Sequence, residues 1–278
     1  MKTDLIQKGS LDMFRSIGFI GTGNMGSAVA KAVSASGLAE ELLLANRTPV
    51  KAEALCAQLN RARSADNLEI ARTCDLIVLG VKPQMMEEML KGIVPELAAR
   101  SDRFVLVTMA AGLTCETVAG YAGGCPVIRI MPNTPCAIGS GVVQYCGLSV
   151  TEEELADFAA ILAPAGLVDR VEEKFIDAAS ALSGCGPAFA YLFVEALADG
   201  AVACGLPRDK ALLYAARTVE GAGRMAAESG KHPGALKDAV CSPGGTTIQG
   251  VRALEEGGFR AAAMEAVIAA YEKTLQLK

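Results

Sequence analysis

The stretch that decides the fold is GFIGTGNMG, residues 18–26. It holds the pattern G-x-G-x-x-G at Gly21, Gly23 and Gly26, after an apolar run and at the start of a predicted helix. In that setting the first glycine allows a tight turn, the second lets backbone approach a pyrophosphate, and the third lets helix and strand pack closely. We predict a dinucleotide-binding unit; the alternative is an ordinary strand–helix turn.

The end of the second predicted strand indicates which dinucleotide binds. An NAD site usually ends this strand with Asp or Glu, which binds the ribose hydroxyls. Here ELLLAN (41–46) ends with Asn46, and Arg47 and Thr48 follow. A guanidinium can bind a 2′-phosphate that a carboxylate would repel. The sequence therefore favours NADPH, with NADH as a weaker cofactor; the alternative is that Arg47 is a solvated loop arginine.

Three later strand ends also carry candidate site residues: GVKPQ (80–84), MAAG (109–112) and MPNTP (131–135). In doubly wound sheets the ligand lies outside the carboxyl ends of the strands. The small residues and prolines suit a flat nicotinamide ring that passes close to backbone. Lys82 is the charged residue among them, and an ordinary surface lysine is the alternative.

The first half of the chain alternates apolar runs with helical segments, which is typical of a parallel sheet covered on both faces. The expected strands cover 15–21, 41–46, 75–81, 104–110 and 126–132, with 167–173 as a last strand. The segments between them, such as 24–37 and 50–59, are expected to be helices, the first closed by Gly37.

Beyond the last expected strand the sequence is rich in Ala, Leu and Glu and predicts helices alone, over 174–183, 187–205, 207–228 and 258–275. We therefore predict an α/β fold in which an N-terminal Rossmann doubly wound sheet precedes an all-helical C-terminal domain. The predicted divisions are an N-terminal tail (1–13), an NADP-binding domain (14–171) and a helical substrate-binding and dimerisation domain (172–278). Dimerisation would bury the Ala- and Gly-rich helices; a compact bundle within one chain is the alternative.

Composition excludes several classes of protein. The chain has 278 residues, a net charge of −5 and no basic run, so we expect no nucleic-acid partner. Its nine cysteines form no C-x-x-C pair and it has one histidine, so we expect no metal site and a reducing, cytoplasmic location. Residues 1–13 do not resemble a signal peptide. The apolar stretch 187–206 carries Glu195 and Asp199, so we expect a core or interface helix and no membrane span.

Ketone reduction would require a proton donor for the forming alkoxide. The one histidine, His232, lies in the loop sequence GKHPG, where a structural or exposed role is more common than catalysis. An imine substrate weakens the requirement, because a protonated imine accepts hydride without forming an alkoxide.

Nearly the whole chain, about 14–275, resembles the pyrroline-5-carboxylate reductases. The motifs GFIGTGNMG, NRT, VKPQ, MPNTP and LSGCGPAFAY (182–191) occur in family order, and HPGALKDAVCSPGGTTIQGVRALEEGGFR is the most specific part. The resemblance implies reduction of 1-pyrroline-5-carboxylate to L-proline with NAD(P)H, the last step of proline biosynthesis. It also implies a homodimer that interlocks through the helical domain, with higher assemblies of dimers possible.

The resemblance also implies the site residues. The cofactor-binding positions are Ile20, Gly21, Thr22, Gly23, Asn24, Met25, Asn46, Arg47, Asn67, Gly80, Val81, Lys82, Pro83, Met109, Ala110 and Ala111. The substrate-binding positions are Glu173, Ser242, Gly244, Gly245, Thr246 and Thr247, and the Thr247 hydroxyl is expected to bond the ring nitrogen as the catalytic group. The chain departs from many members at Cys185, in place of a serine, and from some at Ala239, in place of an asparagine, so a polar contact is not carried over there.

The stretch CSPGGTTIQG (241–250) then has the character of a carboxylate-binding loop. Ser242 and Pro243 suit the N-cap and first position of a helix, and Gly244 and Gly245 would let backbone N–H groups close around a small anion. A structural turn between helices is the alternative.

Two other functions fit part of the sequence. A β-hydroxyacid dehydrogenase has a similar two-domain build but relies on a lysine in its helical domain, and no lysine here lies in a comparable motif. An NADP-binding sensor without catalysis is the second alternative, against which the intact substrate loop argues.

Overall fold

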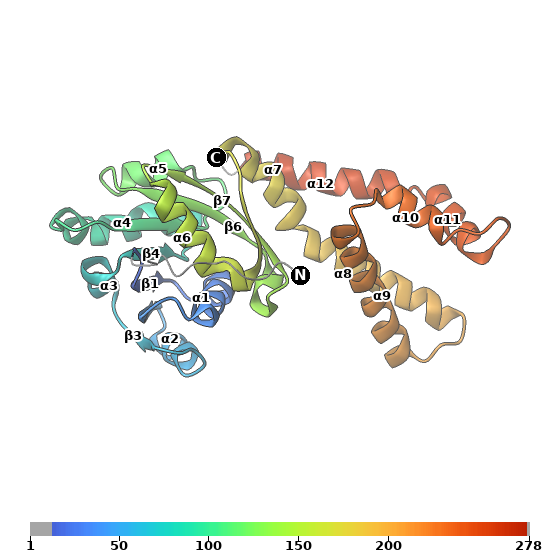
Figure 1. Cartoon of the computed structure of the whole chain (residues 1–278), viewed down its shortest axis with the longest axis horizontal. Coiled ribbons are helices and arrows are strands. Elements are labelled where there is room, and N and C mark those ends of the chain that lie inside the picture. Colours follow the sequence, from blue (N-terminus) through green and yellow to red (C-terminus); the bar gives the residue numbers. More distant parts are fainter. Residues whose placement is uncertain (1–12, 277–278) are drawn as a thin grey trace. The chain divides into compact units, whose positions relative to one another are not determined.

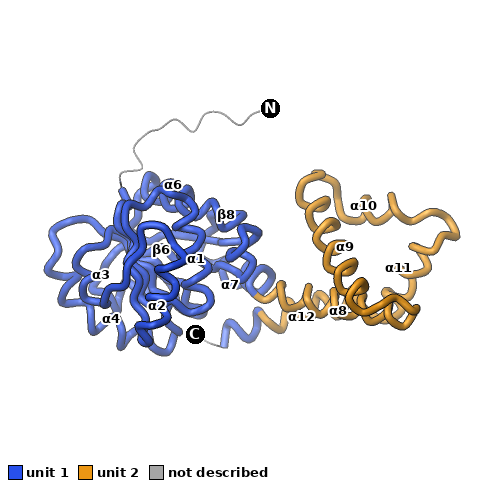
Figure 2. The backbone as a smooth tube through the Cα atoms, turned by 90° about the horizontal axis from the view of Figure 1, so that it is seen from below, with its two compact units in different colours: residues 1–184, 271–278 blue, residues 185–270 orange. Residues whose placement is uncertain are grey.

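The computed structural model describes residues 13–276, so the predicted N-terminal tail lies outside the described residues except for Met13. The chain folds into two compact units (Figure 2). The first runs to Gly184 and also takes the C-terminal end of the chain from Tyr271, and the second is Cys185–Ala270.

The first unit is built on one eight-stranded sheet of order β3-β2-β1-β4-β5-β6-β7-β8. The order reverses between β1 and β4, which is the switch point of a doubly wound fold. The strands are β1 (Ser16–Ile20), β2 (Glu41–Ala45), β3 (Ala62–Ser64), β4 (Leu76–Leu79), β5 (Val105–Thr108), β6 (Val127–Pro132), β7 (Gly141–Leu148) and β8 (Gly166–Arg170).

Helices cover both faces of this sheet (Figure 1). One apolar cluster joins the sheet to α1, α2 and α6, and the other joins it to α3, α4, α5 and α7. The helices of the first unit are α1 (Asn24–Ser36), α2 (Pro49–Cys56), α3 (Asn67–Thr73), α4 (Pro83–Ala98), α5 (Cys115–Tyr121), α6 (Glu152–Leu162) and α7 (Glu173–Ser183), with short 3₁₀ turns η1 (Thr134–Ile138) and η2 (Ala163–Ala165).

The sequence prediction of an all-parallel sheet is wrong at one edge. β7, which was not predicted as a strand, pairs antiparallel with β6, and Ile130 faces Tyr145 in the register. The connection between β6 and β7 holds only η1 and is too short for the crossover that a parallel pair requires, so the chain turns back on itself. The short strand β3 was also missed, whereas Gly37 closes α1 in the left-handed conformation as predicted.

The second unit is helical, as predicted, and contains two helices more than the sequence analysis named. Its helices are α8 (Gly186–Ala203), α9 (Arg208–Glu228), α10 (Pro233–Ala239), α11 (Thr246–Glu256) and the greater part of α12 (Phe259–Leu275), whose end lies in the first unit. Ala198, Ala211 and Ala215 form its small buried cluster. Small residues at this contact let α8 and α9 pack closely.

Much apolar surface of the second unit is exposed. Tyr191 and Leu192 of α8 are 64% and 68% exposed, and large side chains of α9 and α12 are exposed as well. Within residues 13–276, Glu173–Ala203 is the helical stretch that is long and apolar enough to cross a membrane by length and composition, and 11% of its most apolar window is buried. So many exposed large apolar side chains on these helices indicate a site of association.

A buried carboxylate at the N-terminus of α6 makes the stability of the fold depend on pH. Glu154 is 1% exposed, and its carboxylate accepts from Arg103 Nε and Nη2 at 2.7 and 2.8 Å and from the Thr151 N–H at 2.7 Å. The hydrogen bonds from Arg103 hold the pKa of Glu154 below its ordinary value. Because the folded-state pKa is lowered, this stabilisation is present above the unfolded-state pKa and is lost as the pH falls through the folded-state value.

We therefore expect Glu154→Gln to lower the free energy of unfolding by about 1–2 kcal/mol at neutral pH, since Arg103 is partly exposed. The difference from wild type should shrink below about pH 4. Denaturant unfolding at fixed protein concentration across pH measures this. The control is Glu152→Gln, which removes an exposed pair with Arg170 and should change little. A pH-independent loss in Glu154→Gln would contradict the electrostatic explanation.

Candidate functional site

The first glycine-rich loop joins β1 to α1 where three backbone segments meet. Gly21 has φ +102°, a conformation that favours glycine. A Cβ on Gly26 would lie 2.3 Å from the Gly21 carbonyl oxygen, and a Cβ on Gly80 would lie 2.1 Å from the same atom. No side chain fits at either position, so these glycines bring the start of α1 and the end of β4 against the turn.

Gly23 differs from Gly21 and Gly26 because it is exposed and a Cβ there would meet no atom within 4 Å. It is the N-cap of α1 and makes no side-chain cap hydrogen bond, and the Ser27 N–H is bound by the Gly23 carbonyl. The N–H groups of the first turn, before Ser27, therefore present the positive end of the helix dipole. Open backbone at a helix N-terminus is the arrangement that binds phosphate.

The residues after β2 are held to this loop. Asn46 Nδ2 donates to Thr22 Oγ1 at 2.8 Å, and Asn46 Oδ1 accepts from the Thr48 N–H at 3.1 Å. This turn leaves the Arg47 side chain exposed on the same cleft. Lys31 and Lys51 also line the cleft and were missed by the sequence analysis. Lys51 lies four residues after Arg47, at the start of a predicted helix, and that spacing could have indicated it.

An open cleft of about 1680 Å³ runs along the carboxyl ends of the strands in the first unit. The predicted cofactor residues that line it are Ile20, Gly21, Thr22, Gly23, Asn24, Asn46, Arg47, Asn67, Gly80, Val81 and Lys82. Met25 and Pro83, in the first turns of α1 and α4, and Met109, Ala110 and Ala111, which follow β5, do not line it. A cleft of this size, with open glycine backbone and a guanidinium, fits a dinucleotide that carries an additional phosphate.

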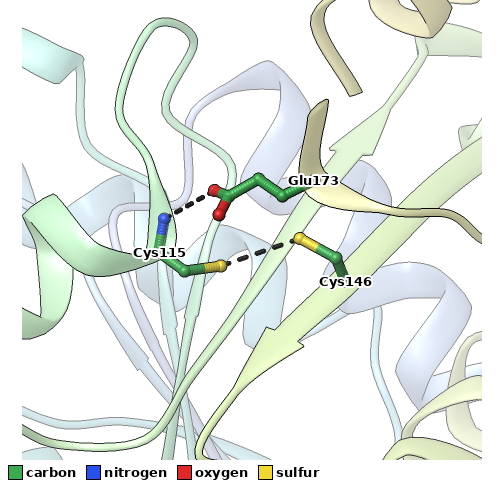
Figure 3. A group of neighbouring side chains, drawn as sticks. All are labelled: Cys115, Cys146 and Glu173. Carbon is green, nitrogen blue, oxygen red and sulfur yellow. Dashed lines mark hydrogen bonds between the residues drawn. The ribbon is translucent and has the colours of Figure 1, made fainter. Parts of the chain in front are cut away.

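Buried polar contacts tie the start of α7 to the sheet. Arg129 of β6 is 1% exposed, and its Nη2 lies 2.5 Å from Asp177 Oδ1 while its Nη1 lies 3.4 Å from Glu173 Oε1. The same Glu173 oxygen accepts from the Cys115 N–H at 2.7 Å (Figure 3). The carboxylate predicted to face substrate is therefore engaged with α5 and β6. Among the described residues, Arg129 Nε is the buried side-chain nitrogen without a hydrogen-bond partner.

The end of α7 is held in the same way. Gln144 Nε2 of β7 donates to Ser183 Oγ at 2.9 Å, and Asn133 Nδ2 donates to the Ser183 carbonyl at 3.0 Å. Asn133 belongs to the MPNTP motif, so one predicted strand end contributes to holding α7 at the point where the SGCGP segment begins.

The second glycine-rich loop lies in the second unit, between α10 and α11. The Gly245 N–H donates to the Ser242 carbonyl at 3.0 Å, and Gly244 has φ +70°. Proline at the second position and a positive-φ glycine at the third are the pattern of a type II turn. The prediction that Ser242 and Pro243 are the N-cap and first position of a helix is therefore wrong. Gly245 is the N-cap, because the turn must close before helical geometry can begin.

This cap also makes no side-chain hydrogen bond, so the first turn of α11 presents backbone N–H groups as the first turn of α1 does. Ser242, Gly244, Thr246 and Thr247 are exposed and Gly245 is half-buried. Thr247 is the second residue of α11 and so belongs to this first turn. A small carboxylate fits such a helix start.

His232 has a structural role. Its Nδ1 accepts from the Gly234 N–H at 3.0 Å and caps α10. The cap hydrogen bond agrees with the structural alternative given for this residue.

Comparison with known proteins identifies similar chains. The model of the pyrroline-5-carboxylate reductase dimerisation family matches residues 173–277, and that of the family described as NADP oxidoreductase, coenzyme F420-dependent, matches residues 16–112. The pyrroline-5-carboxylate reductase of Pisum sativum is 42% identical over 265 residues, covering 94% of this chain and 96% of the relative. That of Escherichia coli is 42% identical over 271 residues, covering 95% and 99%.

A solved structure agrees over both units. The crystal structure of Plasmodium falciparum pyrroline carboxylate reductase with NADP bound matches with a TM-score of 0.82 and 31% identity. The match covers 97% of this chain and 99% of that chain.

The last two glycines of the first pattern, Gly23 and Gly26, give a matched pair of variants. Gly26→Ala places a Cβ 2.3 Å from a carbonyl oxygen, so we expect the free energy of unfolding to fall by about 1–3 kcal/mol. Gly23→Ala has free space for its Cβ, so we expect unchanged stability. The added methyl would nevertheless stand where phosphate approaches, so NADPH affinity should fall about tenfold or more, which is about 1.4 kcal/mol.

Thermal unfolding and NADPH titration of both variants measure these effects. A Gly23→Ala protein that binds NADPH as tightly as wild type would contradict the placement of the phosphates.

Proposed function

Since the chain belongs to the pyrroline-5-carboxylate reductase family, we propose that its two glycine-rich loops divide the reactants, the first holding the cofactor phosphates and the second the substrate carboxylate. The chain reduces 1-pyrroline-5-carboxylate to L-proline and binds NADP(H). The observation that carries the division is that each loop ends at a helix start without a side-chain cap, Gly23 for α1 and Gly245 for α11.

On the cofactor side, the N–H groups at the start of α1 hold the pyrophosphate, and Arg47 binds the 2′-phosphate. The support is that Arg47 is exposed on the cleft, directly after Asn46, whose side chain is hydrogen-bonded to Thr22 of the loop. Asn67, Gly80, Val81 and Lys82 line the rest of the cleft. Pro83 and Met109, Ala110 and Ala111 follow the neighbouring strand ends, and Met25 lies in the first turn of α1. A guanidinium in place of a carboxylate favours NADPH over NADH.

On the substrate side, backbone N–H groups of the loop from Ser242 to Thr246 hold the carboxylate, and the Thr247 hydroxyl bonds the ring nitrogen. The support is the turn at Gly244 and Gly245, which leaves the start of α11 without a side-chain cap. We propose that Glu173 lies on the substrate side and acts indirectly, by holding the start of α7 in place. Its carboxylate accepts from the Cys115 N–H and contacts Arg129.

The residues of the chain bind, orient and polarise. When bound, NADPH supplies the hydride that reduces the imine carbon. A protonated imine already carries its proton on nitrogen, so hydride addition at carbon needs no further proton. The hydrogen bond from the ring nitrogen to Thr247 keeps the ring in one orientation. Reduction of this kind requires no strong acid from the protein, which is consistent with the structural use of His232.

The family's dimerisation domain makes the chain a homo-oligomer. We propose that the oligomer is built from a homodimer formed through the helical domain, in which the exposed apolar side chains of α8 and α9 are covered. Higher assemblies would build on this dimer.

We also propose the domain division at 171/172, which lies next to the start of α7 and of the matched dimerisation model. The cysteines of the described chain are free, and we propose a reducing cytoplasmic location.

Thr247→Ala tests the substrate side. We expect kcat for 1-pyrroline-5-carboxylate reduction to fall about 10–100-fold, because a hydrogen bond to the reacting ring is lost. NADPH affinity should stay near that of wild type. Thr247→Ser keeps the hydroxyl and serves as the control, so it should retain most activity. Weak NADPH binding with normal turnover in Thr247→Ala would contradict the assigned role.

Arg47→Ala tests the cofactor side. We expect kcat/KM for NADPH to fall. The loss should correspond to about 1.5–3 kcal/mol of binding free energy, the value of a hydrogen bond to a charged group. The value for NADH should hardly change, since NADH has no 2′-phosphate, and NADH is therefore the internal control. Steady-state reduction of 1-pyrroline-5-carboxylate with each cofactor measures both values. An unchanged ratio of NADPH to NADH activity would contradict a 2′-phosphate contact.

A further inference from the structure

Two buried thiols and one carboxylate converge outside the cofactor cleft (Figure 3). Cys115 begins α5, Cys146 lies in β7, and Glu173 begins α7. The two sulfurs are 3.7 Å apart, and one donor atom from each of the three residues lies within 4.8 Å of the others. Cys115 and Cys146 are 2% and 6% exposed, so two sulfur donors are shielded from water. They face the half-buried carboxylate of Glu173.

The spacing of the sulfurs matches a metal site better than a disulfide. A tetrahedral ion bound to sulfur at about 2.3 Å holds two sulfurs about 3.7–3.8 Å apart. The observed 3.7 Å between the Cys115 and Cys146 sulfurs agrees with that edge. A disulfide would require about 2.05 Å and therefore a large approach of the two sulfurs.

The three donors enclose a point that an ion could occupy. Because no two of the donor atoms are more than 4.8 Å apart, a point exists within roughly 2.8 Å of all three. Zinc binds sulfur at about 2.3 Å and oxygen at about 2.0–2.2 Å, so side-chain adjustments of a few tenths of an ångström complete the contacts. One Glu173 oxygen is held by the Cys115 N–H, and the other points toward the sulfurs (Figure 3).

Charge balance also permits a divalent ion at this place. Arg129 is buried beside Glu173 and Asp177, so one positive charge already offsets part of the charge of the two carboxylates. Replacing the two thiol protons by one divalent cation leaves the net charge of the group unchanged. Ion binding would therefore add no uncompensated buried charge, which is the main penalty for buried ions.

We propose that Cys115, Cys146 and Glu173 form a binding site for one thiophilic divalent cation of the zinc type, which fastens the start of α7 to β7 and α5. Two thiolates select zinc or cadmium over magnesium and calcium. Three protein ligands leave a fourth position for water, and Glu173, whose side chain is 33% exposed, provides the open side.

The test uses the reduced full-length protein, stripped of metal with a chelator that is then removed. Titration with Cd²⁺ should produce thiolate-to-metal ultraviolet absorbance that saturates at about one ion per chain, and Zn²⁺ should displace it, whereas Mg²⁺ should not. At a hundredfold excess over Kd, Zn²⁺ should raise Tm by roughly 5–10 °C.

Matched variants identify the donors. Cys115→Ala and Cys146→Ala should abolish the saturable absorbance, and Glu173→Gln should weaken Zn²⁺ binding by more than the roughly 10–100-fold typical of outer-shell partners. Cys74→Ala is the control, because Cys74 is a buried free thiol outside the group. NADPH titration, a readout at a separate cleft, confirms that each variant is folded. Glu173→Gln alters a partly exposed side chain and keeps the test informative if a cysteine variant fails to fold.

Two results would overturn the proposal. One is the absence of thiolate-to-metal absorbance in the reduced wild type. The other is an unchanged signal in Cys115→Ala or Cys146→Ala, which would assign the absorbance to the other cysteines.

Discussion

The first unit depends on the close approach of backbone around the Gly21 carbonyl. That oxygen would lie 2.3 Å from a Cβ on Gly26 and 2.1 Å from a Cβ on Gly80, so α1, β1 and the end of β4 meet without any side chain between them. The strand order reverses at the same place, between β1 and β4. A chain that crosses so tightly leaves the cleft beside it lined by open backbone, and phosphates approach N–H groups there without displacing a side chain.

The second unit also presents the uncapped N-terminus of a helix, α11, after a glycine-rich loop, but with a different local geometry. In the first loop the three residues from Gly21 to Gly23 connect β1 to α1, whereas in the second a type II turn that closes at Gly245 precedes α11. Both helix starts lack a side-chain cap, so in each the orphan N–H groups remain available. The difference agrees with the proposed ligands, since a pyrophosphate needs an extended cradle and a carboxylate needs one helix start.

Local patterns in the sequence predicted much of this. The glycine pattern, the apolar strands and the closing Gly37 were sufficient for the Rossmann unit, and the Ala-rich segments for the helices. The antiparallel strand β7 was missed because the alternation of strands and helices predicts a helix after β6, whereas the short η1 connection turns the chain back along β6. The start of α11 was misplaced because the serine–proline pair is equally suited to a cap and to a turn. The group of Cys115, Cys146 and Glu173 could not be predicted, since residues far apart in sequence meet there only through the sheet order.

The central claim is that one loop holds the cofactor phosphates and the other the substrate carboxylate. A crystal structure of the protein with NADP⁺ and L-proline tests it most directly. We predict that the proline carboxylate accepts hydrogen bonds from backbone N–H groups between Gly244 and Thr247, with the Thr247 hydroxyl on the ring nitrogen and Arg47 on the 2′-phosphate. Proline bound with its carboxylate on other residues, while the loop from Ser242 to Thr247 contacts no ligand, would contradict the account.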